Sequence, residues 1–357
     1  ISTVHSQGDP RIFHKQCKSL ADYGYDVNLI IQYPKNEILE RITILGLPTK
    51  KNRLWRMLLG FKAFRWGLKT KAKLIHFHDP ELIPAGLMLK RLGKHVIFDA
   101  HEDVAKQLLS KPYLNALLRQ MLSWGYAKYE TRRVRKFDAI VAATPFIRDK
   151  YRALHSHVVD INNFPMGDEL ASTVPWEGKE AAVCYVGGID RIRGIMEMVS
   201  SLTKTAQPVT LHLAGRFTDS EDAAKALPGW SAVKAWGHVD RLRVREILAR
   251  SLVGLVTLHP IVNYLDSLPV KMFEYMAAGI PVIASHFPLW RDIIEGNRCG
   301  LCVNPLDPSA IAKAIDTLVG DPDLAREMGE NGRQAVITKY NWGVEEKKLL
   351  ALYASLQ

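Results

Sequence analysis

The sequence of 357 residues contains few cysteines. The four are Cys17, Cys184, Cys299 and Cys302. Four cysteines are too few for a disulfide framework in a chain of this length, which excludes the small disulfide-stabilised secreted domains. Cys299 and Cys302 form a lone CxxC pair, and a structural zinc site would need a second pair or histidines nearby. We therefore expect the cysteines to be small apolar core residues, and the compartment to be reducing and cytoplasmic.

Long apolar runs are also missing. No stretch of eighteen apolar residues occurs, so no transmembrane helix is expected. The opening ISTVHSQGDPR has neither the basic region nor the apolar region of a signal peptide. We see no repeats and no low-complexity tracts. The length fits two domains of about 180 residues each, and a hydrophobic content of 47% is enough to form their cores.

Acidic residues are scarce in the first part of the chain. Residues 1–160 contain 28 Lys and Arg against 14 Asp and Glu, whereas the remainder contains 20 against 23. The first part therefore carries a charge of +14 and the second −3. Such a division predicts an anionic partner for the first part, which could be nucleic acid, a membrane surface or a phosphorylated substrate.

Residues 50–73 contain nine Lys and Arg and no acid, interleaved with leucines and aromatic residues such as Trp55, Phe61 and Trp66. Cations among aromatic residues at helical spacing are typical of a helix that lies in a membrane interface. A surface helix that packs its apolar side inward would show the same pattern. The absence of any acid favours the membrane slightly.

Short apolar segments alternate with helical ones along the whole chain, which predicts α/β domains with parallel sheets. The expected strands are 1–5, 27–31, 74–77, 95–98, 139–143, 181–186, 211–213, 233–236, 254–258 and 282–284. Residues 162–179 are rich in Pro, Gly and mixed polarity and form the best linker candidate. We therefore expect one domain over 1–165 and a second over 166–340.

The stretch 254–285 contains the most informative pattern. Its expected strands, 254–258 and 282–284, enclose an irregular polar segment, 263–268, and then a helix that begins near Pro269. Ser267 is placed to cap that helix. A helix start between two parallel strands is an anion site, because its backbone N–H groups lack partners.

Within this helix, Lys271 lies in the first turn, where a purely structural lysine would oppose the helix dipole. Glu274 follows about one turn later on the same face. Gly279 is placed to end the helix in a left-handed conformation, and Pro281 prevents it from continuing. Taken alone, the two charged residues could also be a simple Lys–Glu pair at the edge of a helix.

Polar residues follow two of the expected strands of the first domain. His78, Asp79 and Glu81 follow the strand 74–77, and Asp99, His101 and Glu102 follow the strand 95–98. The carboxyl ends of parallel strands face one ligand crevice, so these two clusters should lie together. Gly8, after the first expected strand, would let the backbone approach a ligand. A role in function is favoured for His101, whereas His78, Asp79 and Glu102 could equally be structural.

Glycines and cations follow the first strand of the second domain. Gly187 and Gly188 would allow close approach to a phosphate, and Arg193 would add a guanidinium fork. No GK[ST] sequence follows, which excludes a Walker motif. The strand-then-glycine pattern returns at Gly237-His238-Val239, before an arginine-rich helix.

The acids Asp266 and Glu274 are separated by seven residues. This spacing resembles the acidic-x7-acidic signature of the retaining glycosyltransferases of family 4, which have the GT-B fold. The resemblance implies that Glu274 binds the ribose of the nucleotide. It also implies that the loop and helix start hold the pyrophosphate and the donor sugar, through Ser267, Leu268, Pro269 and Val270. Asp266 replaces the glutamate that is usual at the first position.

The resemblance extends to the other motifs. In the family an Arg and a Lys of the glycine-rich loop neutralise the donor pyrophosphate. Arg193 falls where that Lys is expected, while Gly188 falls where the Arg usually stands, so Arg191 could substitute for it. The His101 loop is similar to the family's histidine loop at the donor anomeric centre. Gly8 would lie near the phosphate and the acceptor, and Gly237 to Val239 near the nucleotide base.

The resemblance covers the whole chain and implies two Rossmann-like, doubly wound domains that face each other across a cleft. A last helix over 341–357 would cross back to the first domain. The implied catalytic residues are His101, Arg193, Lys271 and Asp266. Because no DxD motif lies on a suitable loop, neither a metal nor another cofactor is expected.

The implied enzyme is a retaining glycosyltransferase with a nucleotide-sugar donor, UDP being favoured over GDP. The acceptor would be a lipid-linked saccharide for a cell-surface polysaccharide, at the inner face of the membrane. Two alternatives remain at this stage. A nucleotide-sugar epimerase could use the same fold, and a nucleic-acid-binding protein would explain the basic half, although no recognised nucleic-acid motif accompanies the charge.

Overall fold

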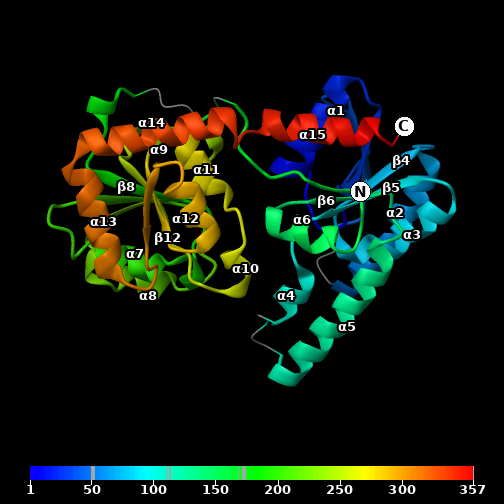
Figure 1. Cartoon of the computed structure of the whole chain (residues 1–357), viewed down its shortest axis with the longest axis horizontal. Helices are drawn as coiled ribbons and strands as arrows, with labels where there is room; N and C mark the ends of the chain where they lie inside the picture. Colours follow the sequence, from blue (N-terminus) through cyan, green and yellow to red (C-terminus); the bar gives the residue numbers. More distant parts are fainter. Residues whose placement is uncertain (50–52, 110, 112–113, 168, 171–173, 357) are drawn as a thin grey trace. The chain divides into compact units, whose positions relative to one another are not determined.

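The computed structural model describes the chain except for residues 50–52, 110, 112–113, 168, 171–173 and 357, and it leaves the side chains of 53–57 undescribed. The chain divides into two compact units (Figure 1). Unit 1 comprises Ile1–Asn163 and Val344–Gln357, and unit 2 comprises Phe164–Gly343. Each unit is built of parallel β-sheet and helices, which confirms the expected pair of Rossmann-like α/β domains.

Unit 1 contains a four-stranded parallel sheet and a three-stranded sheet. The first has the order β4 (Leu74–Phe77), β5 (His95–Ala100), β6 (Ala139–Ala142) and β7 (Val158–Asp160). The second has the order β1 (Val27–Gln32), β3 (Ile42–Leu47) and β2 (Glu37–Leu39), where β2 runs antiparallel to β3.

The strand expected over 1–5 is not a regular strand, but its first residues connect the two sheets. The Ser2 N–H donates to the carbonyl of Ile30 in β1 at 2.9 Å. The His78 N–H, just after β4, donates to the carbonyl of Ile1 at 3.1 Å. The segment therefore lies between β1 and β4 and directs residues 3–9 toward the end of β4.

The helices of unit 1 begin with η1 (Pro10–Cys17), a π-helix that continues into α1 (Lys18–Tyr23). The others are α2 (Arg53–Lys69), η2 (Pro80–Leu82), α3 (Ile83–Arg91), α4 (Val104–Leu109), α5 (Ala116–Val134), α6 (Pro145–Arg152) and α15 (Trp342–Ala354). In the described parts of the chain, every helix is too short or too polar to cross a lipid bilayer.

From Val344 onward α15 belongs to unit 1. The Glu345 carboxylate accepts the backbone N–H of Asn162 at 2.8 Å, and the Lys348 ammonium donates to the Asp160 carbonyl at 3.2 Å. The Tyr353 hydroxyl lies 2.9 Å from Nδ1 of His76 in β4. The last helix is thus part of the structure that supports β4 and β7.

Unit 2 contains one six-stranded sheet whose strands are all parallel. Its order is β10 (Val233–Gly237), β9 (Thr210–Ala214), β8 (Ala182–Val186), β11 (Val253–Val256), β12 (Val282–Ser285) and β13 (Gly300–Val303). The sequence order reverses between β8 and β11. In a doubly wound sheet this reversal opens a crevice at the carboxyl ends of the two strands, where ligands bind.

Helices connect these strands and cover both faces of the sheet. They are η3 (Trp176–Gly178), η4 (Arg191–Arg193), α7 (Ile195–Ser201), α8 (Glu221–Lys225), η5 (Pro228–Ala232), α9 (Arg241–Arg250), α10 (Val262–Leu265), α11 (Val270–Ala277), α12 (Pro288–Ile294), α13 (Pro308–Gly320) and α14 (Pro322–Thr338). Because both faces are covered, β11 and β12 are buried along their whole length, which is why they consist of apolar or small residues.

A glycine of β11 sets how closely α11 packs on the sheet. A Cβ on Gly254 would lie 2.2 Å from the ring of Tyr275 in α11, so no larger residue fits there. The Tyr275 hydroxyl accepts the backbone N–H of Val186 at 2.9 Å. This contact connects α11 to the end of β8, at the reversal point.

Two local expectations need correction and two are confirmed. Ser267 does not cap α11, which starts after Pro269, because the Ser267 hydroxyl donates to the Tyr264 carbonyl at 3.0 Å. Part of the segment expected to be irregular is the helix α10. Gly279 does end its helix in the left-handed region, with a φ of 71°. Cys17, Cys184 and Cys299 are buried and Cys302 is partly buried, and all four thiols are free.

Candidate functional site

The glycine loop of unit 2 lies at the reversal point. Gly187 follows β8 with a φ of 126°, and Gly194 has a φ of 83°. A Cβ on Gly194 would lie 2.1 Å from the carbonyl of Thr257, the residue after β11. Between them, Asp190 caps η4 by accepting the backbone N–H of Arg193 at 2.9 Å. These constraints hold the loop against the carboxyl end of β11.

Lys271 extends from the first turn of α11 toward this loop. Its ammonium lies 3.5 Å from the centroid of the Tyr185 ring and 3.1 Å from the position of a Cβ on Gly187. Although the residue as a whole is partly exposed, its Nζ is buried and has no hydrogen-bond partner among the described residues. Burial, with a contribution from nearby Arg193, lowers the pKa of Lys271 to about 7. A buried cation without an acceptor is costly unless an anion binds beside it.

Arg193 approaches the same loop from η4. Its Nη1 lies 3.0 Å from the position of a Cβ on Gly188, and its guanidinium pairs with the carboxylate of Asp190. Arg191 occupies the exposed side of η4, where its backbone N–H donates to Asp219 at 2.9 Å. The two cations nearest the glycines are therefore Arg193 and Lys271.

Glu274 lies one turn beyond Lys271 and is paired with an arginine that the sequence did not single out. Its Oε1 accepts from Nη1 of Arg241 at 2.6 Å, and its side chain is 12% exposed. Arg241 opens α9, directly after its N-cap Asp240, and its Nε donates to Glu169 at 2.8 Å. The only sequence signal for an arginine beside Glu274 was the arginine-rich helix expected after Gly237-His238-Val239.

The other predicted residues of unit 2 lie in the loops that follow its strands and at the start of α11. Asp266 ends α10, and the carbonyl of Ser267 accepts from Nε1 of Trp290 at 2.7 Å. Leu268 and Val239 pack against the buried core, and Pro269 precedes the first turn of α11, which Val270 begins. Gly237 has a φ of 65° at the end of β10. The predicted residues thus occupy loops at the carboxyl ends of β8, β10 and β11.

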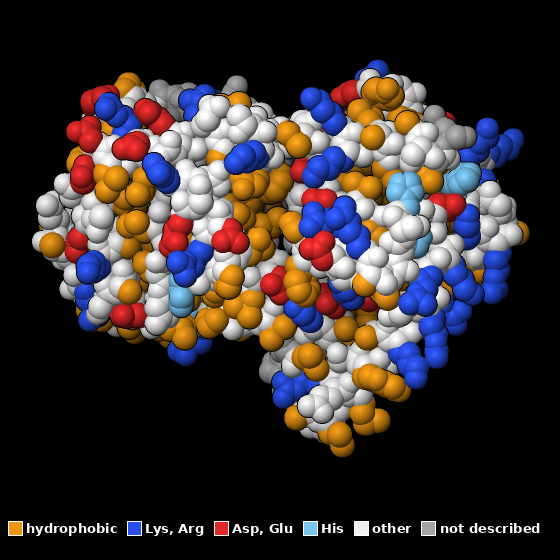
Figure 2. All heavy atoms as spheres, viewed as in Figure 1, with side chains coloured by type: hydrophobic (Ala, Val, Ile, Leu, Met, Phe, Trp, Pro, Cys, Tyr) orange, Lys and Arg blue, Asp and Glu red, His pale blue; other side chains and the backbone are white. Residues whose placement is uncertain are grey.

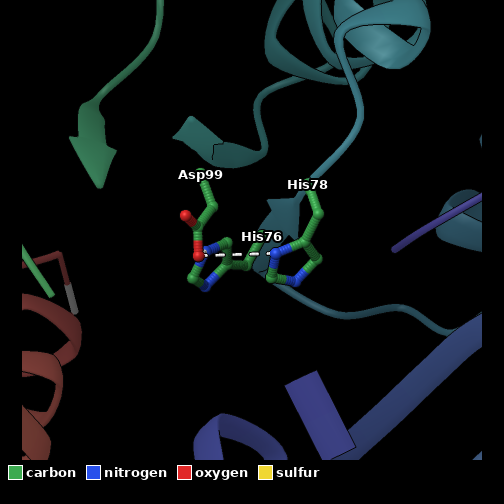
Figure 3. Close-up of side chains that lie close together, drawn as sticks. All are labelled: His76, His78 and Asp99. Carbon is green, nitrogen blue, oxygen red and sulfur yellow. Dashed lines mark ion pairs between the residues drawn. The ribbon is translucent and has the colours of Figure 1, made fainter. Parts of the chain in front are cut away.

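Unit 1 has a polar cluster of its own, centred on Asp99 in β5. This carboxylate is fully buried and accepts from Nη2 of Arg11 at 2.9 Å and from Nε2 of Gln16 at 2.7 Å. His76 of β4 and His78, which directly follows β4, each place a ring nitrogen 3.4 Å from its Oδ2 (Figure 3). Burial opposes ionisation of Asp99, but the adjacent Arg11 holds its pKa well below the usual range.

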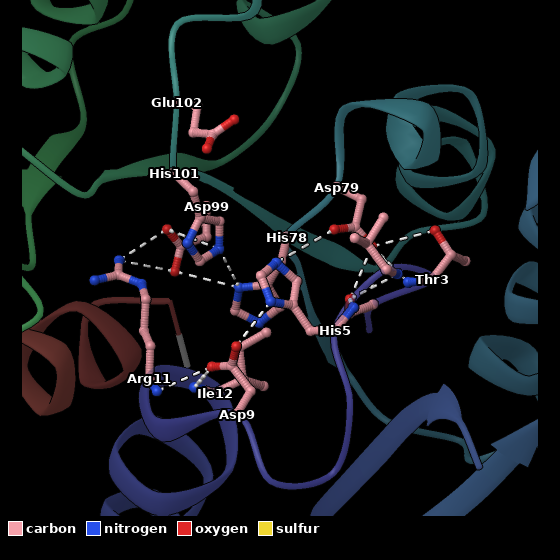
Figure 4. Close-up of polar contacts among 12 residues, drawn as sticks. Thr3, His5, Asp9, Arg11, Ile12, His78, Asp79, Asp99, His101 and Glu102 are labelled. Atoms are coloured by element: carbon pink, nitrogen blue, oxygen red, sulfur yellow. Dashed lines mark hydrogen bonds and ion pairs between the residues drawn. The ribbon is translucent and has the colours of Figure 1, made fainter. Parts of the chain in front are cut away.

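His101 completes this cluster. Its Nε2 lies 3.0 Å from Nδ1 of His78, so the polar clusters that follow β4 and β5 do lie together, as expected (Figure 4). Burial lowers the pKa of His101 to about 4, and Arg11 acts in the same direction. The imidazole is therefore neutral at pH 7, and it can donate a hydrogen bond to a ligand hydroxyl or accept one from it.

The loop that contains Gly8 runs beside these histidines (Figure 4). Asp9 caps η1 through the N–H groups of Arg11 and Ile12, both at 2.9 Å, and accepts from Nδ1 of His5 at 2.8 Å. The rings of His5 and His101 have centroids 5.2 Å apart. Gly8 itself faces open space, whereas Glu102 is exposed on the other side of His101. Sequence reasoning missed His5 and Arg11.

Asp79 has a structural position in this cluster. It accepts from the Ser2 hydroxyl at 2.8 Å and from the backbone N–H groups of Thr3 and Val4. Its carboxylate therefore fixes the segment that connects the two sheets of unit 1.

His76, His78 and Asp99 could in principle ligate a metal, since their ligand atoms lie within 4.8 Å of one another. However, the Asp99 carboxylate already receives the Arg11 guanidinium and the Gln16 amide. A cation added there would be repelled by Arg11. We therefore interpret the group as a hydrogen-bond network that orients His101.

Two family models match the chain. Residues 168–335 match "Glycosyl transferases group 1" and residues 9–163 match "Glycosyltransferase Family 4". Alpha-maltose-1-phosphate synthase of Mycolicibacterium smegmatis is 28% identical over 181 residues, which span 48% of this chain and 47% of that protein. Phosphatidyl-myo-inositol mannosyltransferase of Mycobacterium leprae is 21% identical over 308 residues, 82% of this chain and 76% of that protein.

Solved structures share the fold over nearly the whole chain. Sucrose-phosphate synthase from Thermosynechococcus elongatus aligns with a TM-score of 0.77 at 20% identity, covering 99% of this chain and 94% of that one. The Anabaena protein HepE in complex with UDP-glucose aligns with a TM-score of 0.74 at 13% identity, covering 99% and 98%.

Proposed function

Since the chain belongs to the glycosyltransferases of family 4, which have the GT-B fold, we propose that it transfers a sugar from a nucleotide-sugar donor with retention of anomeric configuration. The observation that carries this proposal is the buried Nζ of Lys271, which lies beside Arg193 and the glycine loop and has no hydrogen-bond partner in the described part of the chain. A donor pyrophosphate is the kind of anion that would supply the missing partner. Fixed cations there would stabilise the charge that develops as a nucleoside diphosphate leaves.

In the proposed reaction, the bond between the anomeric carbon and the diphosphate oxygen breaks. A bond to the acceptor oxygen forms on the same face of the sugar, and the leaving phosphate takes the acceptor proton. Arg193, Lys271 and the start of α11 hold the phosphates. His101 and Asp266 are proposed to position the donor sugar, and no metal is needed in this scheme.

UDP-sugars are the favoured donors, with GDP-sugars next, and HepE was solved with UDP-glucose. Incubation with labelled nucleotide sugars tests the proposal. Transfer or slow hydrolysis that releases a nucleoside diphosphate supports it. Conversion of the donor sugar to its epimer would favour the epimerase alternative, and no reaction with any donor, together with no nucleoside diphosphate binding, would contradict the proposal.

The acceptor is proposed to be a lipid-linked saccharide at the inner face of the cell membrane. Two observations support this. Residues 1–160 carry a charge of +14, which suits an anionic surface. The M. leprae relative is named for a phosphatidyl-myo-inositol acceptor, which is a lipid.

Glu274→Gln is expected to weaken binding of the nucleoside diphosphate by about 1.5–3 kcal/mol. A carboxylate can accept from both ribose hydroxyls with charge assistance, and an amide cannot. Titration calorimetry with UDP and GDP measures the effect. Glu169→Gln is the matched control, because it removes the other carboxylate partner of Arg241. Equal losses in the two variants would show that Glu274 acts through Arg241 rather than through the ribose.

A further inference from the structure

Helix α5 exposes a concentrated set of large apolar side chains. Leu117, Met121 and Trp124 are 69%, 61% and 66% exposed, and Leu118 and Leu122 are 39% and 42% exposed. The helix projects from the sheet of unit 1 in Figure 1, and Figure 2 shows apolar side chains gathered on this projection, with Lys and Arg side chains beside them. We call Leu117, Leu118, Met121, Leu122 and Trp124 the α5 patch. Isolated exposed apolar residues are normal, whereas a contiguous group marks an interaction surface.

The opposite side of α5 accounts for its stability without the patch. The Ser123 hydroxyl donates to the Ala105 carbonyl of α4 at 2.8 Å, and Nη1 of Arg119 donates to the Leu109 carbonyl at 3.1 Å. Nearer the sheet, the buried Glu130 pairs with Lys150 at 2.8 Å. The helix is therefore held by contacts that do not use the patch.

The charge around the patch has one sign. Residues 104–136 contain eight Lys and Arg and a single acid, Glu130, which is buried and paired. Lys128 follows the patch on the same helix, with its ammonium 4.6 Å from the centroid of the Trp124 ring, and Arg132 follows one turn later and is exposed. An apolar helix face bordered by cations and an aromatic residue fits the interface of an anionic bilayer.

We propose that the α5 patch docks the enzyme on an anionic leaflet by shallow insertion, with Lys128 and Arg132 at the lipid phosphates. A second copy of the chain is the less suitable occupant. In a two-fold symmetric contact each patch meets itself, which would bring the cations of both copies together with no exposed acid on α5 to neutralise them. The proposal deepens the proposed function, on which it rests for the lipid-linked acceptor.

This assignment differs from the segment that the sequence favoured. Residues 50–52 and the side chains of 53–57, including Trp55, lie outside the described part of the structure. Within α2, Leu59 and Ala63 are buried, and Phe64 and Trp66 are partly buried against the core of unit 1. Leu58, Phe61 and Leu68 of the same helix are exposed, at 59%, 61% and 37%. In the described part, α2 thus uses much of its apolar side for packing, whereas the patch on α5 is bare.

Co-sedimentation with vesicles of phosphatidylcholine and phosphatidylglycerol tests the proposal. The triple variant Leu117→Gln, Met121→Gln, Trp124→Gln is expected to partition at least about tenfold more weakly than wild type, at low and at high salt. Lys128→Gln with Arg132→Gln should weaken binding by about tenfold or more at low salt, and little at high salt, where surface charge is screened. Leu242→Gln with Ile337→Gln, two exposed apolar residues of unit 2, is the control and should bind as wild type does.

Wild-type binding by the triple variant would overturn the proposal, and so would failure of wild type to bind these vesicles at low salt. A dimer that the triple variant abolishes, without vesicle binding by wild type, would assign the patch to a second copy instead. Leu58→Gln with Phe61→Gln compares α2 directly, and a loss confined to that variant would return the role to α2. Binding of UDP or GDP, measured in parallel, separates the test of membrane docking from the test of the proposed function. The residues proposed to bind the nucleotide lie in unit 2, whereas the α5 patch lies in unit 1.

Discussion

Lys271→Met is expected to lower turnover by about 10²–10³ while leaving the protein folded and at least as stable. The methionine retains most of the side-chain volume but removes a buried ammonium that has no hydrogen-bond partner among the described residues. Burying an unpaired charge costs free energy, so its removal should raise the free energy of unfolding of the ligand-free protein. Steady-state kinetics and denaturant unfolding measure the two quantities.

Opposite changes in activity and stability would identify Lys271 as a residue kept for its ligand. Arg193→Ala should also lower turnover by about 10²–10³, but without the gain in stability, since Arg193 is paired with Asp190. Lys271→Arg should retain part of the activity, because a planar fork does not replace a point charge. Wild-type turnover of Lys271→Met would exclude this lysine from the proposed phosphate site.

The second prediction with a large effect concerns the stability of unit 1 at acidic pH. We expect the free energy of unfolding of unit 1 to fall as the pH decreases from about 6.5 to about 4. The folded pKa of His101 is about 4, below its unfolded value of 6.5, so in this window the unfolded chain binds a proton that the folded one does not. At about 1.4 kcal/mol for each pH unit, His101 alone accounts for about 3 kcal/mol.

Other groups of the cluster modify this response. Burial also lowers the pKa of His76 and His78, and both add to the loss of stability in acid. The pKa of His5 is raised by its contact with Asp9 despite burial, so His5 contributes stability below pH 6.5 and opposes the trend. Denaturant unfolding at a series of pH values, compared between wild type and His101→Asn, isolates the His101 part. An identical pH dependence in the two proteins would show that His101 is not held neutral.

Much of the sheet could be predicted from sequence because its signals are local. The structure has strands at both apolar runs: Ala139–Ala142 is buried throughout, and Leu74–Phe77 alternates partly buried and buried residues. Glycines after β8, and a lysine in the first turn of α11, indicated the site that we propose for the phosphates. A local pattern is enough to predict a strand that is buried on both faces, because nearly all of its residues are apolar. It is also enough to predict an anion site at a helix start whose N–H groups have no side-chain cap.

The rest depends on residues far apart in the sequence. Arg241 reaches Glu274 across 33 positions, and Arg11 reaches Asp99 across 88. Neither pair has a local signature. The expected cap at Ser267 was wrong because α10 offers the Tyr264 carbonyl to its hydroxyl, a tertiary detail. The strands β2, β3, β7 and β13 were not predicted. β2 and β7 have only three residues each, too few to show a period of two.

The discontinuity of unit 1 has a consequence for biosynthesis. Residues 164–343 of unit 2 are one uninterrupted segment, whereas unit 1 needs Val344–Gln357, where Glu345 accepts the Asn162 N–H. A ribosome that adds about 5–20 residues per second needs roughly 10–40 s for the intervening segment. During that time the nascent unit 1 exposes the surface that α15 will cover. We expect arrested nascent chains to give a protease-resistant unit 2 before unit 1 becomes resistant, so the nucleotide-binding half would be completed first although it is encoded second.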